Sequence, residues 1–208
     1  MGQLLTCKVS KDVRAEVHFV NELIYGVAVW LDDTTYSALL HESYYMYNWV
    51  ESTHVLTLMV SLGMLFLIDL RMLGYAFPDV PASKIADRLF VPMIIGFVIM
   101  FITGILLFYA VPVRSAQSLW FRIKMVLLIA CAVNAFVLHR RMSKSVSSWD
   151  QDSRAPSRIR VGAWLSLGFW SVVVICGRFI AYDWLDCIRD QPALIDFMAG
   201  CIDGQTRY

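Results

Sequence analysis

The chain is poor in charge of either sign. Only 17% of its 208 residues are Asp, Glu, Lys or Arg, whereas soluble domains carry about 25%. The 18 basic and 17 acidic side chains leave a net charge of +1, so no basic surface indicates nucleic-acid binding and we expect no nucleic-acid partner. The apolar excess also excludes intrinsic disorder, because disordered chains combine low hydrophobicity with high net charge.

Sequence motifs of soluble enzymes and metal proteins are missing as well. The five cysteines form no Cys-x-x-Cys pair and no His/Cys cluster at zinc spacing, which argues against a structural zinc site. The sequence has no nucleotide-binding glycine loop, no nucleophile with an evident base and no metal-hydrolase motif. We therefore expect a protein that is not an enzyme by itself and has no catalytic residue of these kinds.

Hydrophobic residues, in contrast, make up 58% of the chain, and its mean hydropathy is +0.58. A membrane-spanning helix needs about 20 mainly apolar residues, because the hydrocarbon core is roughly 30 Å thick. Four segments meet this length, at about 49–70, 90–111, 119–138 and 159–182. The sequence predicts an all-α integral membrane protein, with an antiparallel four-helix transmembrane domain over 48–183 between an N-terminal segment 1–47 and a C-terminal tail 184–208.

This arrangement places both termini on one membrane face, here named side A, and the two longer connections on the other face, named side B. Lys and Arg are more numerous near the side B ends of the spans, and positive charge in short loops stays cytoplasmic. We therefore expect side B to be cytoplasmic and both termini to face outward. Residues 34–48 carry tyrosines and leucines at helical spacing, which predicts an amphipathic helix at the interface; a docking role and a simple lead-in to the first span both stay open.

A cluster of polar residues is expected inside the membrane near side A. Ionisable groups in a spanning helix are costly and are therefore functional candidates. Glu51 and His54 share one face of the first span, while Lys124 and Arg178 lie at comparable depth and Tyr182 ends the fourth span nearby. Such a cluster could hold a haem b with His54 as axial ligand, or a quinone head group bound by His54 and Tyr182. The structural alternative is that Glu51 pairs with Arg178 or Lys124 and holds the helices together.

The histidines limit the haem hypothesis. His54 and His139 lie near opposite membrane faces, about 30 Å apart, so they cannot ligate one iron. A second axial ligand near His54 would have to be His41, Met46 or Met59.

A second polar set, made of Asp69, Arg71, Asn134 and His139, lies toward side B. We expect Asn134 to hydrogen-bond between helices, Asp69 to pair with Arg71 or Arg140, and His139 to contact lipid head groups. On side A, Cys187 and Cys201 are candidates for a disulfide, because an outward-facing compartment is oxidising.

Several stretches carry a family resemblance. They are Glu51-Ser-Thr-His54, Asp69-Leu-Arg71, Thr103-Gly104, Phe121-Arg-Ile-Lys124, Asn134-Ala135 with His139-Arg140, and Gly177-Arg178-Phe-Ile-Ala-Tyr182. Over about residues 30–182 the chain resembles an uncharacterised family of bacterial four-helix membrane proteins, a domain of unknown function. The resemblance implies a bacterial inner-membrane location, and with it periplasmic termini, but it brings no activity or cofactor.

The leading functional hypothesis is a small redox-associated inner-membrane subunit that binds a haem, a quinone or a similar group near His54. Its partners would be the lipid bilayer and other membrane or periplasmic subunits. The alternative is a non-catalytic membrane scaffold or assembly subunit of a larger complex. A transport component lined by Asp69, His54 and Arg178 is a third hypothesis, weakened because no internal repeat is evident.

Overall fold

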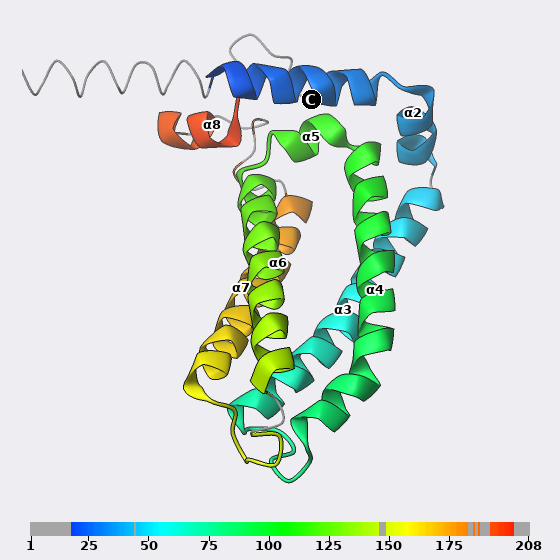
Figure 1. The fold of residues 1–208 in the computed structure, drawn as a ribbon. Coiled ribbons are helices and arrows are strands. Elements are labelled where there is room, and N and C mark those ends of the chain that lie inside the picture. The colour runs from blue at the N-terminus through cyan, green and yellow to red at the C-terminus, as the bar shows by residue number, and fades with distance from the viewer. Residues whose placement is uncertain are drawn as a thin grey trace, which may run out of the picture.

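The computed structural model describes residues 18–43, 45–145, 149–182, 185, 187 and 192–201, and in this part of the chain the regular elements are helices. The first covers residues 18–32. It is followed by α2 (Thr35–Glu42), α3 (Met46–Leu73), α4 (Ala82–Ala110), α5 (Pro112–Ala116), α6 (Leu119–Ser145), α7 (Ser157–Ala181) and α8 (Ala193–Ala199) (Figure 1).

Four helices are long and apolar enough to cross a membrane. They are α3, α4, the Leu119–Met142 part of α6, and α7. The predicted all-α membrane bundle is therefore confirmed, and the chain is a multi-pass membrane protein in contact with the lipid bilayer. Helix α4 begins at Ala82, well before the apolar window predicted at 90–111. The window misses the first turns of the helix because they carry Lys84, Asp87 and Arg88. Hydropathy identifies only the part of a helix that lies in hydrocarbon.

Helix α3 lies centrally in the bundle, packed against both α4 and α7, while α6 packs against α7. The contact of α3 with α4 is close at Gly96, where a Cβ atom would lie 2.0 Å from Ser61 Oγ. Between α4 and α6, the rings of Phe108 and Phe121 stack with centroids 5.4 Å apart. Small residues thus let α3 and α4 approach closely, as is common in membrane bundles.

Arg71 organises the side B end of the bundle. Its side chain is 1% exposed, and it donates hydrogen bonds to the carbonyl oxygens of Val80 (2.6 Å) and Asp152 (3.0 Å). Asp69, fully buried beside Ser166, forms no ion pair with Arg71 or Arg140 in the described part of the chain. The predicted Asp69 pairing is wrong, because the Arg71 guanidinium binds loop carbonyls instead.

The side B connections are also joined directly to each other. The Ser83 amide and hydroxyl donate to the two carboxylate oxygens of Asp150, over 2.8 and 2.6 Å. Asp150 therefore binds one of the free N–H groups in the first turn of α4, as a capping side chain does.

The side A end is covered by short helices. The helix over 18–32 lies across α5 (Figure 1), where Ala28 packs with Val113 and Ala116. Arg122 joins these elements, since it donates to Asn21 Oδ1 at 2.7 Å and to the Ala116 carbonyl oxygen at 3.2 Å. The helix over 18–32 therefore packs on the side A end of the bundle.

The interfacial helix predicted over 34–48 is divided in the structure. Helix α2 ends at Glu42, Ser43 has extended backbone angles, and α3 begins at Met46. Helix α2 is held to α4 by Ser37 Oγ, which donates to the Tyr109 carbonyl oxygen at 2.9 Å. This hydrogen bond holds α2 away from the axis of α3. Helical spacing alone does not reveal such a contact.

The C-terminal segment returns to side A. A disulfide joins Cys187 and Cys201, whose Cα atoms are 5.4 Å apart. Cys187 packs with Leu119 and Ala199 in a small apolar cluster, and the Leu119 amide donates to the Leu185 carbonyl oxygen at 3.2 Å. Leu185, Cys187 and Ala199 are thereby attached to the beginning of α6.

Candidate functional site

The imidazole of His54 bridges α3 and α4. Its Nδ1 lies 3.0 Å from Thr103 Oγ1. The Thr103 hydroxyl also lies 2.8 Å from the Ile99 carbonyl oxygen and 3.1 Å from that of Met100. When this hydroxyl donates to either carbonyl, it accepts from Nδ1–H of His54. A neutral ring with its proton on Nδ1 has its lone pair on Nε2, and the Met100 carbonyl oxygen also hydrogen-bonds the His54 ring.

Gly104 makes room for this ring. A Cβ atom at Gly104 would lie 3.2 Å from His54 Cε1, so a larger residue would press on the imidazole. Thr103 is 7% exposed, and its hydrogen bond to His54 is correspondingly sheltered from water. Thr103 and Gly104 thus form a receptor on α4 for the His54 side chain.

Sequence reasoning missed Thr103 as the partner of His54. The signal was nevertheless present in the sequence. Helices α3 and α4 are antiparallel, so the start of α3 at Met46 and the end of α4 at Ala110 both lie at side A. His54 and Thr103 are about equally far from these ends and therefore lie at similar depth. A hydroxyl residue followed by glycine at matching depth predicts a close polar contact.

Lys124 is the second predicted site residue that the structure places at this point. The charge of its ammonium group acts on His54 and on Cys176 of α7. Lys124 Nζ also lies 4.0 Å from the position of a Cβ atom at Gly177. Helices α3, α6 and α7 thus bring the imidazole of His54 and the Lys124 side chain to the same level near side A.

The other predicted site residues make contacts of their own. Arg178 donates to the hydroxyl of Tyr182 on its own helix, and its guanidinium lies 4.5 Å from the centre of that ring. Glu51 is exposed and forms no ion pair with Lys124 or Arg178 within the described residues. The interhelical ion pair expected as the structural alternative is therefore wrong, since Arg178 is bound within α7.

The candidate second ligands also face elsewhere. His41 makes an edge contact with Tyr47, with ring centroids 6.4 Å apart, and Met46 and Met59 are 57% and 67% exposed. Among the described residues no group of three or more His, Cys, Asp and Glu could hold a metal ion. An ion held by three or more such ligands therefore does not fit the described residues.

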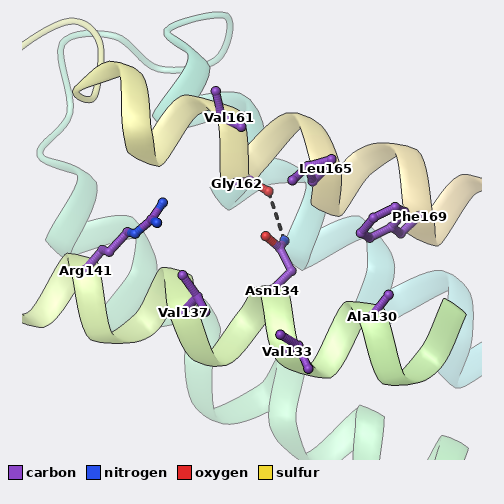
Figure 2. Close-up of a pocket in the computed structure, with 9 residues that line it drawn as sticks. All are labelled: Ala130, Val133, Asn134, Val137, Arg141, Val161, Gly162, Leu165 and Phe169. Atoms are coloured by element: carbon purple, nitrogen blue, oxygen red, sulfur yellow. Dashed lines mark hydrogen bonds between the residues drawn. The ribbon is translucent and has the colours of Figure 1, made fainter. Parts of the chain in front are cut away.

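Toward side B, the predicted role of Asn134 is confirmed. Its Nδ2 donates to the Gly162 carbonyl oxygen at 3.0 Å and joins α6 to α7 (Figure 2). His139 is exposed near the same end of α6. Neither residue belongs to the site around His54.

Comparison with known proteins identifies the family. No curated protein and no solved structure matches the chain. A family of unknown function, DUF6644, matches residues 30–183, which include all four membrane-spanning helices and both His54 and Lys124. The chain therefore belongs to the DUF6644 family of unknown function.

Proposed function

We propose that the protein is a small redox-associated membrane subunit that holds a haem, a quinone or a similar redox group against His54. The observation that carries this proposal is the 3.0 Å contact between His54 Nδ1 and Thr103 Oγ1. With Nδ1 as the donor in this contact, the neutral ring has its lone pair on Nε2. Histidines that ligate metals almost always donate their other ring N–H to an acceptor, which fixes the tautomer. Thr103 performs this task for His54.

The two candidate groups use the site differently. A haem, when bound, would supply one-electron chemistry; His54 would hold its iron, and Lys124 would balance the charge of a propionate. A reduced quinone would donate a hydroxyl hydrogen to Nε2, and Lys124 would donate to the other ring oxygen. An oxidised quinone carbonyl needs a donor, and of these two residues only Lys124 provides one.

The proposed location is the inner membrane of a bacterium, with both termini in the periplasm. The Cys187–Cys201 disulfide on side A supports this orientation, because disulfides persist in oxidising compartments. The arginines at the side B ends of α6 and α7 support it as well, since positive loops stay in the cytoplasm.

Spectroscopy of the purified protein in detergent tests the proposal. We expect a haem spectrum that changes on reduction with dithionite, or a quinone recovered by solvent extraction and mass spectrometry. His54→Ala should remove the bound group, whereas His139→Ala, an exposed histidine at side B, should retain it. A colourless and quinone-free wild-type protein, or unchanged content in a folded His54→Ala variant, would contradict the proposal.

One observation favours the second candidate function, a scaffold or assembly subunit. The helix over 18–32 exposes an apolar stripe at helical spacing, formed by Phe19, Leu23, Val27 and Trp30, which are 66%, 59%, 50% and 68% exposed. This stripe lies roughly opposite Asn21 and Ala28, which pack on the bundle. Exposed apolar patches of this kind mark interaction surfaces.

Lipid is a poor occupant of that stripe. Helix α5 follows the side A end of the α4 span, and packed helices lie about 8–10 Å apart, so the stripe lies beyond the hydrocarbon. A photo-crosslinking residue at Leu23 should capture a partner subunit in native membranes, and one at the exposed His18, which lies on a different face of the helix, should capture it less. Crosslinks to lipid alone would contradict the scaffold function.

A further inference from the structure

A groove runs along the lipid-facing junction of α6 and α7 (Figure 2). Its volume is about 500 Å³, within the range of small-ligand sites. Two small residues, Ala130 and Gly162, leave the space, and branched or aromatic side chains form its walls. The walls are Val133 and Val137 from α6, and Leu165 and Phe169 from α7.

The groove has a defined length and direction. Figure 2 shows Arg141 at one end and Ala130 with Phe169 at the other. The eleven-residue separation of Arg141 and Ala130 corresponds to about 16 Å along a helix axis, roughly half of the 30 Å hydrocarbon thickness. The groove thus extends from the side B boundary to about the middle of the membrane, which is the depth that one acyl chain of one leaflet occupies.

The floor of the groove is closed by a satisfied polar contact. Asn134 lines it, and its amide donates to the Gly162 carbonyl oxygen. This bond holds α6 and α7 together beneath the groove, so the hollow exists before a ligand arrives. The Asn134 amide already has a hydrogen-bond partner in Gly162. The rest of the lining is mainly apolar and suits a hydrocarbon chain.

The open end of the groove is positively charged. Arg141 Nη1 donates to the Arg158 carbonyl oxygen at 3.2 Å, which fixes the guanidinium beside the start of α7. Arg140, Arg158 and Arg160 lie in the same helix ends, and the described residues that line the groove include no acidic one. A planar guanidinium matches the geometry of a phosphate, and basic pockets between membrane helices bind phospholipid head groups.

We propose that the groove between α6 and α7 is a binding site for an acidic phospholipid of the side B leaflet. One acyl chain lies along the groove past Gly162, and the head-group phosphate binds Arg141. This site is separate from the residues around His54, and it stands whether or not a redox group is bound there.

Lipid titration of the purified full chain in detergent, followed by native mass spectrometry, tests this site. The probes are phosphatidylglycerol and phosphatidylcholine with identical acyl chains. The wild-type protein should bind one phosphatidylglycerol in preference to phosphatidylcholine. Arg141→Gln should lower that preference about fivefold, since one basic residue near the head groups contributes about 1 kcal/mol.

Two further variants separate charge from groove shape. Arg88→Gln removes an exposed cation from the same membrane side, on α4, and should leave the preference unchanged. Val133→Trp fills the groove from a residue that is 58% exposed, and should lower the binding of both lipids. Thermal melting of each variant identifies any loss of fold.

Three outcomes would overturn the proposal. The first is an unchanged preference for phosphatidylglycerol in Arg141→Gln. The second is an equal loss in Arg88→Gln, which would indicate a general effect of surface charge. The third is that an isoprenoid quinone is found bound, and that Val133→Trp displaces it whereas Arg141→Gln does not. The occupant of the groove would then be a neutral tail rather than an acidic phospholipid.

Discussion

Arg71 Nε lies 2.6 Å from the carbonyl oxygen of Val80. The same guanidinium reaches the carbonyl oxygens of Asp152 at 3.0 Å and Ser153 at 3.4 Å. A single side chain from the end of α3 therefore binds both side B connections. Only the five donors of an arginine, arranged as a fork, can serve carbonyls in several directions at once.

Replacing Arg71 should therefore destabilise the fold strongly. We expect Arg71→Gln to lower the free energy of unfolding by about 3 kcal/mol, because buried carbonyls lose charge-assisted hydrogen bonds. Unfolding by dodecyl sulfate in mixed micelles, followed by circular dichroism, measures this change. Arg88→Gln, an exposed position, should stay within about 0.5 kcal/mol of wild type; equal effects of the two variants would contradict the role of Arg71.

Asp150 makes the stability depend on pH. Burial alone would raise the pKa of its carboxyl, but the hydrogen bonds from Ser83 and the charge of Arg71 outweigh burial and hold the pKa below its usual value. The stabilisation from a carboxylate with a lowered pKa is present above the unfolded pKa, about 3.9, and is lost as the pH falls through the folded pKa.

The difference in unfolding free energy between wild type and Asp150→Asn should therefore be constant from pH 7 to pH 5 and shrink toward pH 3. Melting temperatures of both proteins across this range provide the measurement. A difference that stays constant down to pH 3 would show that the Asp150 charge contributes nothing.

Gly96 is required where α4 meets α3. A methyl group there would lie 2.0 Å from Ser61 Oγ, so Gly96→Ala should destabilise the bundle by about 1–3 kcal/mol through overpacking. Gly63 and Gly168 have no neighbouring atom within 4 Å of an added Cβ, and alanine there should be neutral or stabilising. Combining Gly96→Ala with Ser61→Gly should recover part of the loss, and no recovery would rule out the steric explanation.

The fold could be predicted from the sequence because each spanning segment is an uninterrupted apolar run, which hydropathy detects without knowledge of its neighbours. Asn134 could also be predicted, because an amide inside a span needs an interhelical partner. The binding of Arg71 to Val80 and Asp152 could not, because backbone carbonyls have no sequence signature. The contact of Arg178 with Tyr182, in place of an ion pair with Glu51, was missed for a related reason. Depth in the membrane places residues at one level, but only the rotation of each helix decides which of them meet.

The disulfide provides a test of topology. In a Cys7→Ser background, Cys187 and Cys201 should take up two maleimide groups after mild reduction and none before it, because Cys131 and Cys176 are buried. A membrane-impermeant maleimide applied to intact cells should reach both cysteines after reduction. Cysteine introduced at the exposed Gln151 on side B should react only after permeabilisation, and the reverse pattern would overturn the proposed orientation.

The tautomer of His54 can be measured directly. Solid-state NMR of the protein labelled with ¹⁵N-histidine should show His54 protonated at Nδ1 in the neutral state, because Thr103 accepts from that nitrogen. Thr103→Val removes the acceptor and should abolish the preference, while Thr103→Ser retains a hydroxyl and should preserve it. If a haem or reduced quinone binds Nε2, its content should fall in Thr103→Val although His54 is still present. An unchanged tautomer in Thr103→Val would show that Thr103 does not set the proton position, and would remove the main support for a ligand at Nε2.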